Sequence, residues 1–453
     1  MTTKINYNQI NGAVFNILSY GADATGVADS SAALALAITD AQTLSIGGTV
    51  FIPRGIWKLT SAINMTNLSY PISITGVGRG TQIKASGIST VVFDCTGSSD
   101  VIFKDVQISV ASGTPQVGIL FARSTTAQSL RCSLQNVDMS GNYSVAPVFN
   151  YCSEEFYCYR AYLWNQYQDG CAYFETQDNQ TGISGFVQLV PGTGFATMLN
   201  TLASNTAKHF INCSFQVSGT NVSDYTDCVR IRGATNFSMD GCFYVPSTYL
   251  GASTTSRSTI LVDSSQVNAP LQDFSLTNFR SEGGRKATDF IYSSGNDTTP
   301  QYWVVENGYA DAVANLLETT LTNIAYMRWN NVIGQTATQI TVGGNMVYCS
   351  GNYQKITAAG LYTCDLACLS TSVFTYADPS NLILFRDTGM RAVGGPNATT
   401  ATTGQFAIPT VFGTPTGVPA VILSGTIPMQ YDTANNFLYF YTNGVWKKST
   451  VYS

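Results

Sequence analysis

FKDVQI, residues Phe103–Ile108, is one copy of a six-residue pattern that recurs along the chain. The pattern is an apolar residue, any residue, Asn, Asp or Gly, an apolar residue, any residue, and an apolar residue. It returns in LQNVDM, FINCSF and MDGCFY, more loosely in LTNFRS, VENGYA and WNNVIG, and in degenerate form in YRAYLW. The third positions are residues 105, 136, 161, 212, 241, 278, 307 and 331. Most intervals are 24 to 37 residues, and we expect the longer one, 161 to 212, to contain a further copy.

A strand of this length cannot bury its apolar face alone, so the copies must stack on one another to build a continuous core. Strands that repeat in one direction pair in parallel, and the connections between them wind right-handed. Asn or Gly at the third position marks a corner, where the left-handed conformation is useful. The pattern therefore predicts an all-β fold, a right-handed parallel β-helix with smaller C-terminal β regions. A leucine-rich repeat would show Leu every two or three residues, and a sandwich would show closer hairpin turns.

Ahead of the repeats, Asp29–Gln42 predicts a short helix, which Asp29 or Ser30 can cap. One face of this helix is apolar and comprises Ala33, Leu34, Ala37, Ile38 and Ala41. The open end of a β-helix exposes an unpaired strand edge, which recruits other strands. We therefore expect the helix to cap the first coil.

The amino-acid composition of the chain limits the classes of partner and ligand that we expect it to bind. Charged residues are 11% of the 453 residues and aromatic residues 12%, with a net charge of −5. Nucleic-acid binders carry a basic footprint, so we expect no nucleic-acid partner. No stretch approaches the roughly 20 apolar residues of a spanning helix, and the first residues lack a signal-peptide core. We expect no membrane partner, synthesis in the cytoplasm without a signal peptide, and a neutral or weakly anionic ligand such as a polysaccharide.

The eleven cysteines include no CxxC pair, and the chain has a single histidine, His209. A zinc site usually needs four Cys or His ligands in paired spacing. We therefore expect no metal and no cofactor, and we interpret the cysteines as reduced thiols that pack as small apolar residues.

Two N-terminal stretches carry a family resemblance: SYGADATGVADSSAAL at 19–34 and GGTVFIPRGIWKL at 47–59. The motif positions are Tyr20 to Asp23, Thr25, Gly26, Asp29, Gly47, Gly48, Val50, Pro53, Gly55 and Trp57. They resemble the start of the pectate-lyase-like right-handed parallel β-helix of bacteriophage tailspikes and related polysaccharide-degrading proteins. The resemblance covers about 40 residues directly and implies this fold, a phage or bacterial surface context and a homotrimer. It carries no catalytic motif.

We expect four segments: an N-terminal attachment peptide (1–18), the β-helix (19–335), a C-terminal β region that is a sandwich or an intertwined stem (336–411), and a small terminal β module (412–453). Turn signals at 434–436 and 443–444 divide the last segment into strands too short to form a core alone, which favours packing between chains. Attachment to other virion tail or baseplate proteins would use the short N-terminal peptide, another protein or the C-terminal end.

Candidate catalytic residues come from the outward positions of the repeat. The second positions should face outward and are Lys104, Gln135, Arg160, Ile211, Asp240, Thr277, Glu306 and Asn330. Parallel neighbours stand about 4.8 Å apart, which places Asp240 and Glu306 two coils, or about 10 Å, from each other. Inverting glycosidases hold their acid and base roughly 6.5–9.5 Å apart, a range that leaning side chains can reach. A solvated surface position is the plain alternative for both carboxylates.

Further candidates surround this pair. The fifth positions place Phe243, Arg280 and Tyr309 nearby, which suits sugar binding by stacking and hydrogen bonds. Glu282 is a third candidate catalytic residue, and Arg285 could orient it or bind an acidic sugar, although a surface ion pair is the alternative. A second candidate patch, 153–175, carries Glu154, Glu155, Asp169 and Glu175 among many tyrosines.

Taken together, these features predict a phage tailspike-like protein of the virion, a homotrimer that binds and depolymerises a bacterial surface polysaccharide, capsule or O-antigen. The plant-type polygalacturonase motifs are missing, so the reaction stays open between a glycoside hydrolase, which we favour, a lyase that uses Arg or Lys as its base, and no reaction. The alternative function is a non-catalytic structural appendage or receptor-binding protein of the virion with the same fold.

Overall fold

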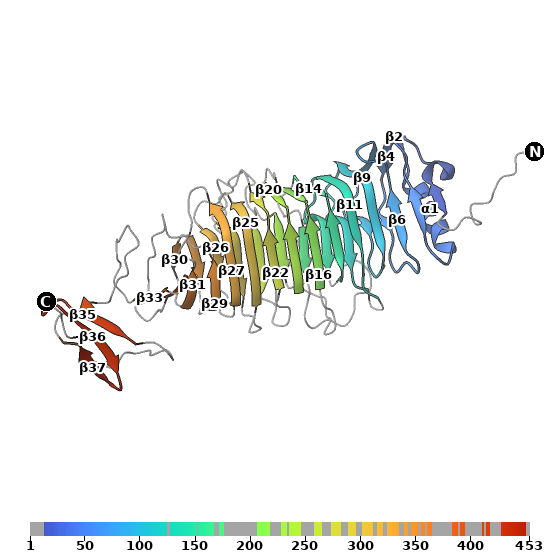
Figure 1. Cartoon of the computed structure of the whole chain (residues 1–453). Coiled ribbons are helices and arrows are strands. Elements are labelled where there is room, and N and C mark those ends of the chain that lie inside the picture. The colour runs from blue at the N-terminus through green and yellow to red at the C-terminus, as the bar shows by residue number, and fades with distance from the viewer. Residues whose placement is uncertain are drawn as a thin grey trace, which may run out of the picture.

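Two long parallel ladders dominate the computed structural model of the chain (Figure 1). The structure describes residues 13–124, 127–151, 153–166, 172–175, 206–217, 228–232, 235–245, 258–264, 273–281, 289–295, 301–310, 315–319, 324–334, 339–342, 346–351, 355–357, 360–364, 383–387, 390–394, 410–411, 414–416 and 427–449. The chain coils through both ladders as a right-handed parallel β-helix, which confirms the predicted fold.

The larger ladder, sheet A, has 22 strands. These are β1 (Val14–Asn16), β2 (Thr25–Asp29), β3 (Gly48–Phe51), β4 (Gly55–Leu59), β6 (Ile72–Thr75), β7 (Thr81–Ser86), β9 (Val101–Ser112), β11 (Ser133–Gly141), β13 (Phe156–Tyr159), β14 (Tyr162–Asn165), β16 (Thr206–Ile211), β17 (Ser214–Val217), β19 (Thr235–Asp240), β20 (Phe243–Val245), β22 (Asp273–Thr277), β23 (Arg280–Ser281), β25 (Gln301–Ala310), β27 (Ile324–Gly334), β29 (Met346–Gly351), β31 (Gly360–Cys364), β32 (Ile383–Asp387) and β33 (Met390–Gly394).

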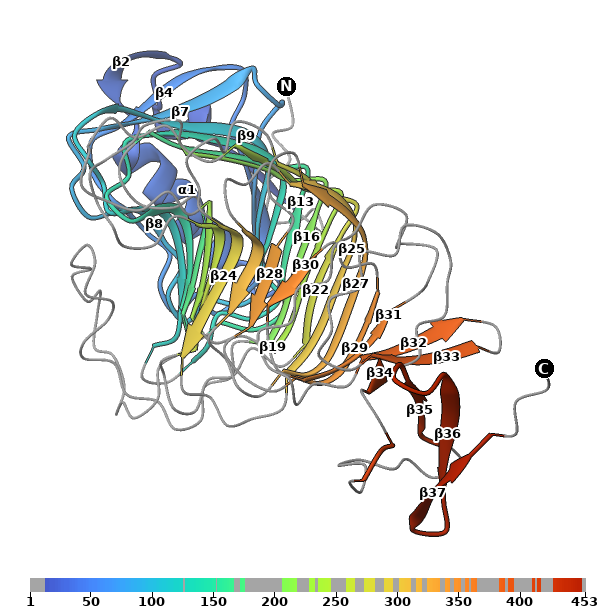
Figure 2. The ribbon, with the colours of Figure 1, turned by 90° about the vertical axis from the view of Figure 1, so that its left-hand side faces the viewer.

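The second ladder, sheet B, has 11 strands and lies across the core from part of sheet A (Figure 2). Its strands are β5 (Ile63–Asn64), β8 (Val91–Asp94), β10 (Val117–Ala122), β12 (Ala146–Tyr151), β15 (Ala172–Glu175), β18 (Val229–Arg232), β21 (Ser258–Ser264), β24 (Asp289–Gly295), β26 (Asn315–Thr319), β28 (Gln339–Val342) and β30 (Lys355–Thr357). From β3 to β28, each coil therefore contributes two arms to sheet A and one arm to sheet B.

In the eight coils from β9 to β27, a residue in the left-handed conformation marks the corner between the two arms of sheet A. These corner residues, all with positive φ, are Asp105, Asn136, Arg160, Asn212, Gly241, Asn278, Asn307 and Asn331. Seven of them are the third positions of the sequence pattern. Side chains also bridge successive corners: the Asn136 amide donates to the Asp105 carboxylate at 2.7 Å, and the Asn331 amide donates to Asn307 at 3.2 Å.

The degenerate copy YRAYLW lies one residue out of the expected register. Arg160, with φ of 51°, is the corner instead of Ala161. Ala161 is buried, and Tyr162 faces outward beside Asp138 of the preceding coil. Tyr159, rather than Arg160, therefore occupies the second position, beside Gln135.

The expectation of a further copy between residues 161 and 212 is wrong. β13 pairs directly with β16, and β14 pairs directly with β17, so consecutive rungs of sheet A follow each other here. The extra residues lie within this one coil, between its strands, and add no rung to the ladder.

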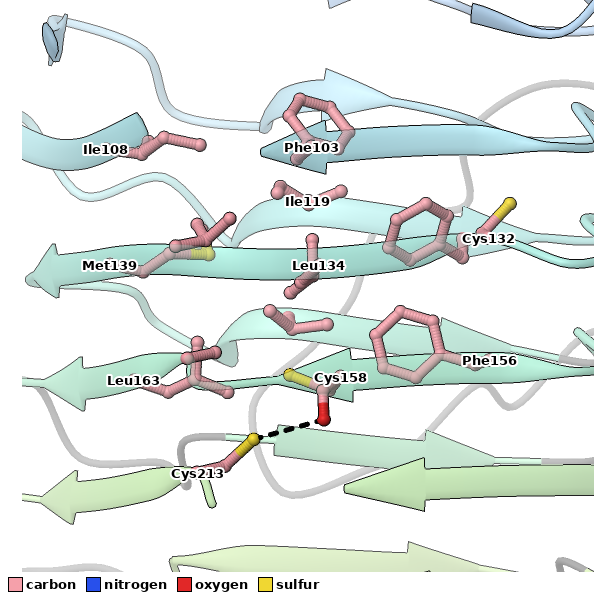
Figure 3. Packing of buried hydrophobic residues seen from close by; sticks show 14 of the residues in the cluster. Phe103, Ile108, Ile119, Cys132, Leu134, Met139, Phe156, Cys158, Leu163 and Cys213 are labelled. Atoms are coloured by element: carbon pink, nitrogen blue, oxygen red, sulfur yellow. Dashed lines mark hydrogen bonds between the residues drawn. The ribbon is translucent and has the colours of Figure 1, made fainter. Parts of the chain in front are cut away.

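Inward positions of successive coils stack into the core (Figure 3). The first positions are all at most 1% exposed: Phe103, Leu134, Cys158, Phe210, Met239, Leu276, Val305 and Trp329. Each fully buried large side chain contributes roughly 1.5–3 kcal/mol. Six cysteines are buried free thiols, as expected: Cys95, Cys132, Cys158, Cys213, Cys228 and Cys242. The Cys213 thiol donates to the Cys158 carbonyl at 3.3 Å.

The predicted capping helix is α1 (Ser31–Thr43), and its five predicted apolar residues are buried. It follows a 3-10 turn, η2 (Ile17–Tyr20), and a loop organised by Asp23. The Asp23 carboxylate accepts hydrogen bonds from the backbone of Thr25, Val27 and Ala28 and from the Thr25 hydroxyl. Burial raises the pKa of Asp29, but hydrogen bonds from Ser31 and Thr60 outweigh this effect and leave the pKa lowered.

Parallel pairing continues beyond residue 335: β27 pairs with β29, β29 with β31, and β31 with β32. A separate four-stranded sheet contains β34 (Thr410–Val411), β35 (Met429–Asp432), β36 (Phe437–Thr442) and β37 (Val445–Lys448). The two turn signals of this region do form turns, with positive φ at Asn436, Asn443 and Gly444. The four domain boundaries remain predictions.

Candidate functional site

The candidate site lies on the outer surface of sheet A, along the line of corner residues. On one side of this line runs the second-position ladder: Lys104, Gln135, Tyr159, Ile211, Asp240, Thr277, Glu306 and Asn330. Thr277 pairs with Asp240 on one side and Glu306 on the other. The two carboxylates are therefore two rungs apart, about 10 Å along the ladder, as the sequence predicts.

Asp240 ends β19 and is exposed. Its Oδ1 atom accepts hydrogen bonds from the Thr277 hydroxyl at 2.7 Å and from the Asn278 amide at 2.8 Å. Both donors are neutral and belong to the next rung, toward Glu306. They fix the orientation of the carboxyl group, and both recorded contacts use the same oxygen.

Glu306 lies in the middle of β25 and makes an ion pair with the next rung. Arg328 Nε lies 2.7 Å from Oε1, and Arg328 Nη2 donates to Oε2 at 3.0 Å. The Asn330 amide also donates to Oε1, at 2.9 Å. The Glu306 side chain is 18% exposed and that of Arg328 is 45% exposed, so solvent still reaches the pair.

The fifth-position ladder runs on the other side of the corner line. Phe243 pairs with Arg280, and Arg280 pairs with Tyr309, so these three candidates occupy the same three rungs as Asp240, Thr277 and Glu306. Five of the seven predicted site residues thus come together along one ridge. The other two, Glu282 and Arg285, lie outside the described residues.

The second predicted patch, 153–175, does not form a single surface. Glu154 and Glu155 precede β13 on sheet A, whereas Glu175 ends β15 on sheet B. Asp169 lies outside the described residues. Within the described part of the chain, we find no group of His, Cys, Asp and Glu arranged to hold a metal ion. In that same part, no helix has the length and apolar character needed to cross a bilayer.

Sequence reasoning missed two elements of this surface. Arg328 stands one residue before the copy WNNVIG and so outside the six-residue pattern; its alternation with Asn330 on the outward face is the corresponding sequence signal. Tyr157 and Tyr159 are 47% and 40% exposed on β13, and the Y-x-Y spacing in FYCYR is the corresponding signal.

Comparison with known proteins places the fold in a broad class. Residues 14–142 match the family model described as rhamnogalacturonase A/epimerase, pectate lyase-like. The match ends before Asp240 and Glu306. No curated protein matches this chain.

Solved structures with a similar fold include phage and bacterial proteins. A tailspike protein mutant of Escherichia coli bacteriophage HK620, in complex with a pentasaccharide, is 10% identical with a TM-score of 0.51, over 82% of this chain and 64% of that chain. An exopolygalacturonase from Thermotoga maritima is 10% identical with a TM-score of 0.46, over 86% of this chain and 96% of that one. The tailspike of Acinetobacter baumannii bacteriophage Fri1, described as a capsular polysaccharide depolymerase, is 12% identical with a TM-score of 0.48, over 86% of this chain and 66% of that chain. At 10% identity and a TM-score of 0.51, the property that this chain shares with the HK620 tailspike is the fold.

Proposed function

We propose that this chain binds a bacterial surface polysaccharide along the ridge between the second- and fifth-position ladders and hydrolyses it there. The observation that carries the proposal is the pair Asp240 and Glu306, two rungs apart on one ladder with Thr277 between them. The backbone spacing of about 10 Å along the ladder is close to that of enzymes that invert the anomeric centre, where a water molecule must fit between acid and base. The bonds to Thr277 and Asn278 turn Asp240 toward Glu306, whereas Glu306 turns toward the following rung.

The contacts suggest a role for each carboxylate. Glu306 is ion-paired with Arg328, and an ion-paired carboxylate accepts hydrogen bonds, which suits a base that activates water. Asp240 accepts hydrogen bonds from two neutral donors at Oδ1, and we assign to its other oxygen the protonation of the leaving sugar oxygen. Phe243 and Tyr309 would stack on sugar rings, and Arg280 would bind hydroxyl or carboxylate groups of the polymer.

The proposal extends to the assembly: a homotrimer on a phage virion, in contact with other tail or baseplate proteins. Its support is the resemblance of the N-terminal motif to tailspikes and the small size of the C-terminal sheet. Only Asp432, Tyr439 and Tyr441 of the described residues of that sheet are buried. A sheet with so small a core gains from packing against another subunit.

A second candidate function is a non-catalytic receptor-binding appendage. One specific observation favours it: both oxygens of Glu306 are already bonded to Arg328 and Asn330 within the ladder. Such contacts are also what a purely structural ion pair between rungs would make.

The test is to incubate the purified full chain with capsule and O-antigen preparations from a panel of candidate hosts. New reducing ends without ultraviolet absorbance indicate hydrolysis, and absorbance from an unsaturated uronate indicates a lyase. Binding without either product supports the appendage. For an active preparation, Asp240→Asn and Glu306→Gln should abolish cleavage and retain binding. Asp273→Asn, which changes an exposed carboxylate elsewhere on β22, serves as the matched control. Normal cleavage by both site variants would place the catalytic residues elsewhere.

A further inference from the structure

Two exposed aromatic rings lie on the N-terminal side of Asp240. Tyr157 and Tyr159 are 47% and 40% exposed, and both lie on the outward face of β13, because alternate residues of a strand share a face. Their inward neighbours, Phe156 and Cys158, are buried. Two large rings side by side on an outer sheet face leave apolar surface open to solvent.

The rings are held in place by their neighbours. The His209 imidazole stacks on Tyr157 with centroids 5.2 Å apart and planes 23° apart, and His209 Nδ1 lies 2.7 Å from the Ser238 hydroxyl. On the other side of Tyr157 the ladder neighbour is Ser133, whose side chain is small. The imidazole therefore supports one face of the phenol ring, and Ser133, which is buried, lies toward the other; the ring is open to solvent on the outward side of the sheet, where Tyr157 is 47% exposed.

Tyr159 connects these rings to the candidate site. It pairs with Ile211, which is 40% exposed, and Ile211 pairs with Asp240. Tyr159 is thus two rungs, about 10 Å, from Asp240, on the side away from Glu306. The Arg160 guanidinium lies 5.0 Å from the centre of the Tyr159 ring and limits its movement.

We propose that Tyr157 and Tyr159, supported by His209, form a stacking platform for the sugar rings of the polysaccharide on the N-terminal side of Asp240. This inference rests on the proposed function and adds the path of the polymer, which runs across the rungs from the platform toward Asp240 and Glu306. The apolar face of a pyranose packs on an aromatic ring, and the phenol hydroxyls supply hydrogen bonds to sugar hydroxyls.

A polysaccharide fits this surface better than a second copy of the chain. The platform is two rungs deep, and polar residues border it on both sides, with Gln135 before Tyr159 and Ser238 after His209. A stable protein interface buries about 800 Å² on each partner. Two half-exposed rings between polar ladders are too small for that, but they match a short run of sugar rings.

The test uses native electrophoresis of the full-length protein in gels that contain the capsule or O-antigen preparations of the panel. In a gel that retards the intact protein, the Tyr157→Ala/Tyr159→Ala variant should bind about tenfold more weakly. Tyr157→Phe/Tyr159→Phe, which keeps both rings, should bind within about twofold of the intact protein. Tyr302→Ala is the matched control, because Tyr302 is 50% exposed on the same sheet, away from the platform. It too should stay within about twofold.

Each other outcome overturns the platform. Undiminished binding by the double alanine variant does so and leaves the proposed function intact. An equal loss in Tyr302→Ala shows that the two rings have no special role. A lower oligomeric mass of the alanine variant in light scattering assigns the rings to contacts between subunits. Retardation of the intact protein by none of the gels overturns the proposed function together with the platform.

Discussion

The phenyl ring of Phe279 covers the Cα of Gly308 on the next rung, so closely that a Cβ at residue 308 would lie 2.1 Å from the ring. The opposite side of the Phe279 ring is occupied as well, because it stacks on Phe290 with centroids 4.9 Å apart. Glycine is thus required in the inward column beside Glu306 for reasons of space alone.

Gly308→Ala should therefore destabilise the protein by about 1–3 kcal/mol, the usual range for an overfilled core. Urea unfolding followed by circular dichroism measures the change. Adding Phe279→Leu to Gly308→Ala should recover part of the loss, because the smaller side chain can withdraw from the new methyl group. If the single variant is as stable as the parent, the ring is free to move and the packing described above is wrong.

At the Asn136 corner, the contribution of the hydrogen bond to stability can be separated from that of the left-handed conformation. Asn136→Ala removes the hydrogen bond to Asp105 and places alanine, which has a Cβ but no polar group, at φ 54°. The lost bond and the left-handed conformation both lower the stability of this variant. Asn136→Gly loses the hydrogen bond but adopts this φ readily. The alanine variant should be less stable than the glycine variant by about 1 kcal/mol in the same unfolding measurement. The reverse order would mean that the left-handed conformation costs little at this corner and that the greater freedom of glycine in the unfolded chain outweighs it.

Arg328 offers a test of positioning at the candidate site. In a preparation that the protein cleaves, Arg328→Gln should lower kcat by about ten- to a hundredfold with little change in KM, because Glu306 loses its fixed orientation while the sugar-binding residues remain. Steady-state kinetics on the polymer separates the two constants. The matched control is Arg79→Gln, which breaks the exposed ion pair with Asp138. A rise in KM at constant kcat would instead make Arg328 a substrate-binding residue.

The N-terminal cap should weaken in acid. The backbone of Thr25 and Ala28, the Thr25 hydroxyl and the backbone of Val27 donate to Asp23 and lower its pKa to about 2, against an opposing effect of desolvation. A lowered pKa in the folded state gives stability that is complete above the unfolded value of about 3.8 and is lost as the pH falls toward 2. Between pH 5 and pH 2 (about the interval of that titration), the protection of the α1 amides against hydrogen exchange, corrected for the intrinsic exchange rate at each pH, should fall in the parent.

Asp23→Asn should remove most of that pH dependence, because an amide does not titrate. Asp273→Asn, at an exposed position far along the chain, should leave it unchanged. An unaltered pH response in Asp23→Asn would assign the acid sensitivity to another carboxylate, for which Asp29 is the first candidate because its pKa is also lowered.

The repeat and its corners could be predicted from the sequence because each coil places the same residue types at the same positions. Asn, Asp or Gly stands at seven of the eight left-handed corners, and this fixed the register that brings Asp240 and Glu306 to one ladder. The register failed at Arg160, where arginine occupies a conformation in which it has no special preference. Because Tyr159 and Tyr162 can each count as apolar, the six-residue pattern fits this stretch equally well in two registers that differ by one residue.

The partners of the carboxylates were less accessible. Glu306 meets Arg328 only because the next coil is short enough to place residue 328 beside Val304. The number of residues in a coil decides which side chains of neighbouring rungs meet, and this number cannot be read from a local sequence pattern. The same holds for the stacking of His209 on Tyr157, which depends on how many residues the intervening coil contains.

Coil length has one further consequence. Corner residues are 24 residues apart from Asn136 to Arg160 and 52 apart from Arg160 to Asn212, yet the strands on either side remain neighbours in strict alignment. The scaffold therefore tolerates large insertions between its strands without disturbing the ladder. Other sequences can therefore replace the inserted residues, so new recognition can evolve, or be engineered, while the ladder that carries Asp240 and Glu306 stays unaltered.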